Sequence, residues 1–248
     1  MKRSNNRRLF PCSALIPAFG LIALFTSLSG AAAPEEKAID APHGVRVSVK
    51  MIGPVTQVTD LQIICVLKHE PAGDKYIEAM KGLDDKLGGL LSRLRDRGEF
   101  AGEAGETFLF TPPANSIPAK RMLLIGVGEE NALTLDRLRL VGRIAAREAV
   151  RLNVEHVGFA PALRDQGSNR IDVGEGDAAV TGQFLLAYDT EKRLQAQSLS
   201  PKVELKDFTI EAGPKFFEGA VAKVTAAVAA AAAEIKQRSD TPYSEVSH

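Results

Sequence analysis

Three stretches of the chain carry the hydrophobic pattern of β-strands. Residues 45–51, VRVSVKM, alternate strictly between apolar and other side chains, which is the period of a strand with one buried face. Residues 61–67, LQIICVL, and 122–127, MLLIGV, are apolar along almost their whole length, as is typical of strands covered on both faces. Three further strands are predicted at 106–111, 154–160 and 203–210.

Helical periodicity marks four other segments. In residues 74–97, apolar side chains recur every three or four positions, with Gly88 and Gly89 as a weak point near the middle. Residues 134–152 follow the same period, and Thr134 is placed to act as an N-cap, because its side-chain oxygen can accept a hydrogen bond from the first turn. Two more helices are predicted at 177–188 and at 218–238, the second of them rich in alanine.

The alanine-rich helix carries a narrow apolar stripe of the kind found at coiled-coil seams. Its members fall at alternating steps of three and four residues: Val221, Val224, Val228, Ala231 and Ile235. Such a seam is either an exposed surface for a protein partner or for self-association, or the face by which the helix packs on its own domain. The sequence leaves both alternatives open.

The alternation of strands and helices predicts the fold class. We expect an α/β domain at 45–212, with a three-layer arrangement in which a mixed sheet is flanked by helices. The alanine-rich helix at 213–238 follows this domain, and residues 239–248 form a tail. The polar, proline-containing residues 34–44 are expected to be a disordered linker.

The beginning of the chain has the layout of an export signal. Basic residues precede an apolar run at 14–28, and small residues follow it at 29–33. The run is short and is interrupted by a proline and a glycine, so it would make a poor membrane span. We expect a signal peptide at 1–33, cut after Ala31 or Ala32, and a periplasmic or secreted product that does not bind membranes. The alternative is an uncleaved anchor.

A more specific export motif lies inside this segment. The stretch NRRLF, with Arg7 and Arg8 followed by Phe10, resembles a twin-arginine signal. That route carries folded proteins, so folding would precede export. Cys12 lies before the apolar run and is therefore not a lipoprotein anchor.

Charge and cysteine content narrow the function classes. Without the four basic residues of the signal, the chain has 27 basic and 31 acidic side chains, a net charge of about −4. This balance argues against a nucleic-acid partner, because phosphate binding needs clustered Lys and Arg. Cys65 would be the single remaining cysteine, so neither a disulfide nor a thiolate metal site is expected, and a buried apolar role fits it best.

Residue types that carry catalysis are scattered along the chain. The histidines form no pair at ligand spacing, and His156 lies in an apolar strand, where a structural role is expected. Three acidic pairs fit solvated helix ends and loops better than metal sites: Glu35-Glu36, Asp84-Asp85 and Glu129-Glu130. No nucleophile elbow, His-Glu-x-x-His motif or Walker A loop is found. The sequence therefore predicts no catalytic residue, no metal ligand and no cofactor.

One turn is a candidate for a phosphate cradle. The strand RMLLIGVGEEN at 121–131 runs into Gly126-x-Gly128, but Asn131 stands where a dinucleotide fingerprint has its third glycine. Glu129 and Glu130 would also repel a phosphate. Gly126, Gly128 and Asn131 are therefore candidate residues for a small anion or a nucleotide only through the amides at the start of the following helix.

The order of several motifs resembles the N-terminal domain of the leucyl aminopeptidases. The motifs are EFAGEAGE at 99–106, RMLLIGVG at 121–128, LRLVGRIAA at 138–146, TGQFLLAY at 181–188 and RSDTPY at 238–243. The resemblance runs from about 45 to 242. It implies a macro-domain-like fold, a mixed sheet between helices, although the Gly-rich loop by which macro domains bind ADP-ribose is not found.

The same resemblance carries no catalytic residue to this chain. In the leucyl aminopeptidases the two metal ions and the catalytic residues belong to a C-terminal domain with a signature near NTDAEGR, and this sequence ends at His248, where that domain would begin. The resemblance therefore implies kinship with a peptidase and not peptidase activity.

Three functions remain in view. The leading interpretation is an exported, non-catalytic domain that acts as a binding or interaction module. A second is a small-anion or nucleotide binder that uses a macro-like cleft near Gly126, Gly128 and Asn131. A third is a non-catalytic partner, or a remnant, of a split metallo-aminopeptidase, which would dock through the seam on the last helix.

Overall fold

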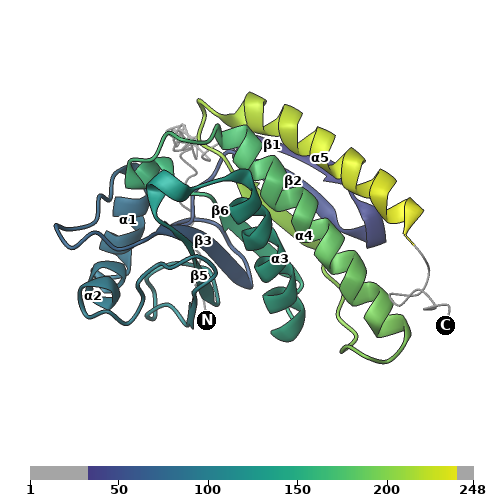
Figure 1. The fold of residues 1–248 in the computed structure, drawn as a ribbon, viewed down its shortest axis with the longest axis horizontal. Coiled ribbons are helices and arrows are strands. Elements are labelled where there is room, and N and C mark those ends of the chain that lie inside the picture. Colours follow the sequence, from purple (N-terminus) through teal and green to yellow (C-terminus); the bar gives the residue numbers. More distant parts are fainter. Residues whose placement is uncertain (1–32, 239–248) are drawn as a thin grey trace, which may run out of the picture. The chain divides into compact units, whose positions relative to one another are not determined.

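Among residues 33–238, which the computed structural model describes, seven strands form one mixed sheet (Figure 1). The chain falls into two units, Met1–Ala33 and Pro34–His248, and the sheet belongs to the second. The strands are β1 Glu36–Asp40, β2 Arg46–Lys50, β3 Leu61–Leu67, β4 Thr107–Phe110, β5 Met122–Gly128, β6 His156–Ala160 and β7 Asp207–Glu211. Apart from Ala33, the predicted signal and tail lie outside the described residues.

The strand order across the sheet is β1-β2-β7-β6-β3-β5-β4. The five central strands are parallel, while β1 and β4 pair antiparallel at the two edges. The continuous apolar runs of β3 and β5 are buried along their whole length, as the sequence predicts. The carboxyl ends of β2, β7, β6, β3 and β5 consequently meet at one end of the sheet.

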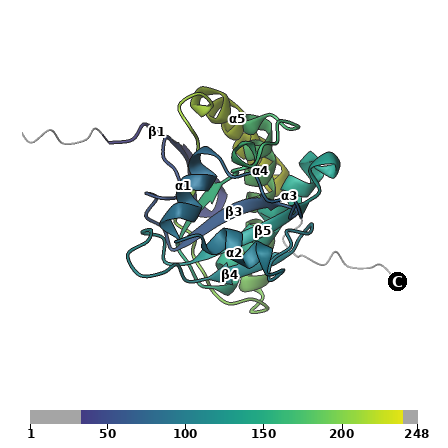
Figure 2. The same ribbon diagram turned by 90° about the vertical axis from the view of Figure 1, so that its left-hand side faces the viewer.

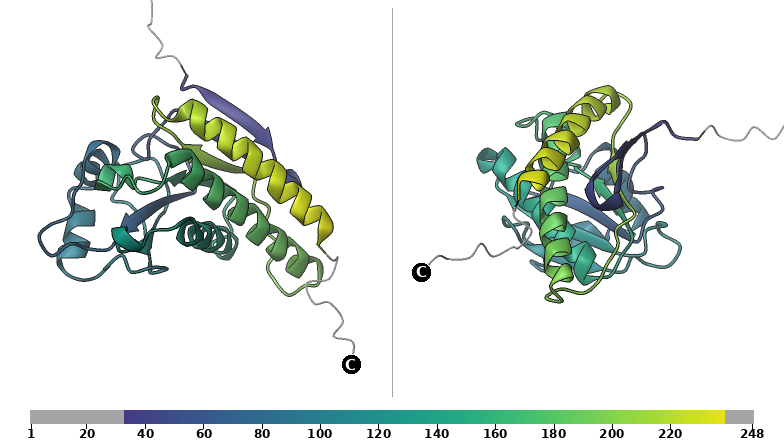
Figure 3. Two further views of the ribbon diagram at one scale, coloured as in Figure 1. Left: turned by 45° about the horizontal axis from the view of Figure 1, so that its top comes forward. Right: turned by 90° about the vertical axis from the view of Figure 1, so that its right-hand side faces the viewer.

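Helices cover both faces of this sheet and complete the expected three layers. The helices are α1 Glu78–Lys86, α2 Leu90–Asp96, α3 Leu135–Arg151, α4 Val173–Ala196 and α5 Phe217–Gln237. Helices α3, α4 and α5 share a large apolar core with one face, whereas α1 and α2 share a smaller one with β3 and β5 on the other. Figure 2 shows α1 and α2 away from α5, and Figure 3 shows α4 and α5 side by side.

The local signals act as the sequence predicts at two positions. The Thr134 hydroxyl oxygen accepts a hydrogen bond from the Arg137 N–H (3.4 Å) and caps α3. Gly88 and Gly89 adopt positive φ angles of 68° and 75°, and they divide the single helix predicted at 74–97 into α1 and α2.

The linker prediction is wrong for residues 34–44. Most of this segment is the strand β1 followed by a 3₁₀ turn at Pro42–Gly44. Backbone pairing with β2 fixes β1, and its side chains are largely exposed, so its sequence lacks an apolar pattern. No helix within the described part of the chain is both long enough and apolar enough for a bilayer crossing.

Candidate functional site

The glycines at the end of β5 are bound by the turn that precedes β4. The Gly126 N–H donates to the Glu106 carbonyl oxygen (2.8 Å), and the Gly128 N–H donates to the Gly102 carbonyl oxygen (2.9 Å). The Gly105 N–H donates in turn to the Gly126 carbonyl oxygen (2.9 Å). Both amides of the Gly-x-Gly sequence are thus satisfied within the chain and are not free to hold a phosphate.

Close backbone contact explains why position 126 is glycine. A Cβ atom there would lie 2.1 Å from the Glu103 carbonyl oxygen and 2.6 Å from the Gly102 carbonyl carbon. Such distances are well inside van der Waals contact, so any side chain would force the turn away from β5. The two glycine motifs at 99–106 and 121–128 are therefore two halves of one packing arrangement.

The surroundings of this turn also argue against an anion at these residues. Lys68 pairs with the carboxylates of Glu103 (3.0 Å) and Glu129 (3.1 Å), which neutralise it. Asn131 is exposed in the 3₁₀ helix Glu130–Ala132. None of Gly126, Gly128 and Asn131 lines the cavity described below.

The apolar seam of α5 packs inside the chain, which is the second of the two alternatives that the sequence leaves open. Val224, Val228 and Ile235 are 0%, 3% and 9% exposed, and the half-buried Val221 packs on the same core. Helix α5 contacts α4, β1 and β2. The seam is apolar because it covers the edge of the sheet formed by β1 and β2.

The remaining chemical candidates have structural partners. His156 pairs through Nδ1 with the Asp207 carboxylate, and Cys65 is buried, where burial raises the pKa of its thiol. Asp84 caps α2 by accepting from the Leu91 N–H (2.8 Å). Among residues 33–238 no three His, Cys, Asp or Glu side chains are grouped so that they could hold a metal ion.

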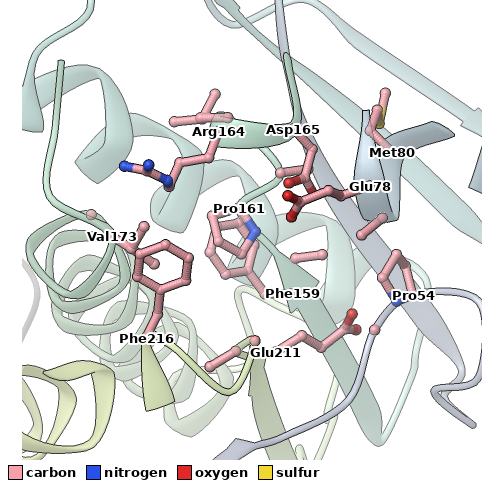
Figure 4. A pocket seen from close by; sticks show the side chains of 18 of the residues that line it. Pro54, Glu78, Met80, Phe159, Pro161, Arg164, Asp165, Val173, Glu211 and Phe216 are labelled. Atoms are coloured by element: carbon pink, nitrogen blue, oxygen red, sulfur yellow. The ribbon is translucent and has the colours of Figure 1, made fainter. Parts of the chain in front are cut away.

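A cavity of about 510 Å³ opens at the carboxyl ends of β2, β7 and β6 (Figure 4). The connections after β3 and β6 leave the sheet in different directions, the first to α1 and the second to α4. Ligands of open α/β sheets bind at such switch points, outside the carboxyl ends of the strands. Residues of α1, of the segment after β6 and of the first turns of α4 line this cavity.

Most of the lining is apolar. Phe159 and Pro161 form the wall at the end of β6, and Phe216 and Val173 lie opposite, from the loop before α5 and the start of α4. The Arg164 guanidinium is 5.0 Å from the centroid of the Phe216 ring, over which it stacks. An apolar chamber with few polar groups is the usual form of a small-molecule site.

The polar groups of the cavity are mainly carboxylates. Figure 4 shows the carboxyl groups of Glu78 and Asp165 next to one another. Burial raises the pKa of Asp165, and the Glu78 charge raises it further, although the Met80 N–H and Arg164 oppose both effects. Two carboxylates therefore converge here without a paired cation between them.

A third carboxyl group, that of Glu211, lies deeper. Glu211 is 5% exposed at the end of β7, and among the described residues its oxygens make no hydrogen bond of good geometry, although the Gln62 side chain lies near enough to act on its charge. Burial raises its pKa to about 8, although the side chain of Gln62 works in the opposite direction. In Figure 4 its side chain extends toward Pro54, on the same side of the cavity as Glu78 and Asp165.

The sequence interpretation did not select these three residues. Glu78 is exposed at the start of α1 and Asp165 is half-buried in the 3₁₀ helix Arg164–Gln166, and neither carries a motif. Glu211 offered no clear signal, because it alternates with Phe208 and Ile210 and falls, with Asp207 and Thr209, on the polar positions of β7, which predict an exposed face. Asp172, which also lines the cavity, caps α4 by accepting from the Glu175 N–H (3.1 Å).

The fold and the position of the cavity define an α/β domain of the macro-domain-like class. Its sequence matches the profile of the cytosol aminopeptidase family, N-terminal domain, over residues 63–194. The chain belongs to this family. The resemblance stated from the sequence motifs is thereby confirmed.

Curated relatives are whole aminopeptidases of which this chain spans about a quarter. The probable cytosol aminopeptidase of Roseiflexus castenholzii is 28% identical over 141 residues, which cover 56% of this chain and 26% of that protein. The probable cytosol aminopeptidase of Thermosynechococcus vestitus is 37% identical over 127 residues, which cover 50% of this chain and 24% of that protein.

Solved structures show the same fold. A mutant of tomato leucine aminopeptidase superimposes with a TM-score of 0.56 at 21% identity, covering 81% of this chain and 38% of the tomato chain. An Oceanobacillus iheyensis macrodomain solved with ADP gives 0.54 at 10% identity and covers 79% of this chain and 98% of the macrodomain. The expected macro-domain-like arrangement of a mixed sheet and helices is confirmed.

Proposed function

We propose that this chain is an exported, non-catalytic domain of the aminopeptidase N-terminal type, which binds a small ligand in the cavity at the carboxyl ends of β6 and β7. The observation that carries the proposal is the cavity itself, an apolar chamber of about 510 Å³ with a few carboxyl groups in its lining. Buried polar groups without partners are costly, and a ligand that satisfies them removes that cost.

The fold comparison supports a small-molecule ligand. The macrodomain with a similar fold was solved with ADP, so a domain of this architecture holds a small molecule. In this chain the N-terminus of α4 opens on the cavity, which on its own would attract an anion. The Asp172 carboxylate already occupies that helix end, and this weakens the anion alternative.

The binding role is tested by filling the cavity. Ala79 lines the cavity and is exposed at the start of α1, so Ala79→Trp places an indole in the chamber without displacing core side chains. Ala226→Trp, on the exposed side of α5, is the matched control. Thermal-shift screening with ADP-ribose, AMP, phosphate, amines and neutral alcohols should find a ligand whose stabilisation is lost in Ala79→Trp and kept in the control. No stabilisation by any of these compounds would overturn the binding role.

The non-catalytic and export parts have separate tests. Purified protein with Mn²⁺ or Zn²⁺ should release no p-nitroaniline from leucine p-nitroanilide, and release would overturn the non-catalytic part. For export, fractionation of cells that express the full chain should place it outside the cytoplasm, with a new N-terminus after Ala31 or Ala32. Replacement of Arg7 and Arg8 by lysine should hold it in the cytoplasm if the twin-arginine route is used.

A further inference from the structure

The charges around the cavity are strongly unequal. Four carboxyl groups line it, Glu78, Asp165, Asp172 and Glu211, against one cationic side chain, Arg164. Arg164 stacks on Phe216, and Asp172 is used as the cap of α4. The other three carboxyl groups have no cation among the ion pairs of the described residues.

The Glu78–Asp165 pair is held in place by the backbone. The Ile77 N–H donates to the Asp165 carbonyl oxygen (2.8 Å), which ties the start of α1 to the segment after β6. Glu78 itself has a φ of 43°, in the left-handed region that a non-glycine residue seldom occupies. Strained backbone of this kind concentrates at ligand sites, and here it occurs at one of the two neighbouring carboxylates.

Glu211 provides an independent observation that points to a ligand. It is 95% buried, lines the cavity, and leaves both carboxyl oxygens without hydrogen-bond partners of good geometry among the described residues. A buried carboxyl group without such partners destabilises the fold unless a bound group donates hydrogen bonds to it or pairs with its charge. A positive charge in the chamber would favour its ionised form and supply the missing interaction.

We propose that the cavity binds an organic cation, with an ammonium group between Glu78 and Asp165, an apolar body against Phe159 and Phe216, and Glu211 as the third carboxyl group. This inference rests on the proposed binding function and names the chemical class of its ligand. A primary ammonium group has three N–H donors, whose hydrogen bonds two carboxylates can accept. An apolar body gains the burial that the rest of the lining offers.

The experiment compares three probes of nearly equal size in isothermal titration calorimetry. Phenethylammonium carries the expected charge, 2-phenylethanol is its neutral counterpart, and 3-phenylpropionate is an anion. Wild-type protein should bind phenethylammonium in preference to the other two, and the affinity should fall as NaCl is added. Glu78→Gln and Glu211→Gln should each weaken that binding by about tenfold or more, because a charge-assisted contact is lost.

A matched variant separates this effect from a general change of charge. Glu218→Gln removes a carboxylate from the exposed surface of α5, outside the cavity, and should leave the dissociation constant unchanged. Circular dichroism on each variant confirms that the fold is retained. Equal or tighter binding of the alcohol or the anion, lost in Ala79→Trp, would overturn the cationic ligand while leaving the proposed binding function intact. No binding by any probe would overturn the cationic ligand, whereas the binding function itself would fall only if the thermal-shift screen also found no ligand.

Discussion

Arg238, at the end of α5, donates a hydrogen bond from Nη1 to Oδ2 of Asp189 (3.0 Å), which lies 49 residues earlier within α4. The same carboxylate accepts from Arg193 Nε (2.8 Å) and is paired with His43 Nε2 (2.8 Å). The side chain of Asp189 is 1% exposed. One buried carboxylate therefore joins the turn after β1, the middle of α4 and the end of α5.

Asp189→Asn should be strongly destabilising. The substitution keeps the shape of the side chain but leaves the cationic partners without their negative charge, and breaking a buried pair in this way costs about 3 kcal/mol or more. Chemical denaturation measures the loss. Asp136→Asn, at an exposed pair with Arg139, is the control and should cost less than about 1 kcal/mol. A loss no greater than that of the control would contradict the role of Asp189.

The contribution of Asp189 to stability should depend on pH. Burial alone would raise the pKa of Asp189, but hydrogen bonds from Arg193, His43 and Arg238 outweigh it and hold the pKa below its ordinary value of 3.8. A lowered folded-state pKa means that the stabilisation is present above pH 3.8 and is lost as the pH falls through the folded value. Below that range the wild type and Asp189→Asn should converge in stability.

Gly126→Ala should destabilise the protein by about 1–3 kcal/mol, because the new Cβ would overlap the backbone at Glu103 and Gly102. Gly219→Ala is the matched control, since a Cβ at that helical position meets nothing within 4 Å. There the change should stabilise by about 0.5–1 kcal/mol through the reduced entropy of the unfolded chain. Equal effects at the two glycines would contradict the packing of the two motifs.

Glu211 gives the opposite pH dependence from Asp189. Its folded pKa of about 8 lies above its ordinary value of 4.5, so between these values the folded state keeps a proton that the unfolded state has released. Stability should therefore fall as the pH rises through this window, by up to about 1.4 kcal/mol per pH unit. Glu211→Gln should remove that slope and stabilise the protein at pH 8. Identical pH profiles for the two proteins would contradict the assignment.

Val228→Ala should lower the free energy of unfolding by about 1.5–3 kcal/mol, since the side chain lies on the buried face of α5 and is 3% exposed. Val58→Ala, at a valine that is 77% exposed, should change the free energy of unfolding very little. Light scattering of Val228→Glu should show an unchanged mass together with a large loss of stability. A change of oligomeric state without loss of stability would restore the seam as a surface between molecules.

Hydropathy predicts those elements whose burial follows their own sequence. Strands β2, β3 and β5 were expected because alternation or continuous apolarity records which of their faces are covered. Strand β1 was missed because its partner, β2, and not its side chains, holds it. Helix α4 is longer than predicted because its buried face includes polar and small residues, such as Asp177 and Gly174.

The candidate site was the least predictable part of the molecule. Glu78, Asp165 and Glu211 are far apart in sequence and meet only because β6 and β7 are neighbours and α1 packs beside the segment after β6. The residues around each of the three in the sequence therefore do not indicate that they come together in the fold. The glycine motif at 121–128 can be recognised in the sequence, but its glycines serve the backbone contact between β5 and the turn before β4.

The two apolar cores on opposite faces of the sheet both reach the cavity. Met80 and Leu83 line it from the smaller core, and Leu138 and Val180 line it from the larger one. A molecule bound there contacts the two helical layers at once, so its binding free energy couples their unfolding. Unfolding of either layer would thereby release the molecule.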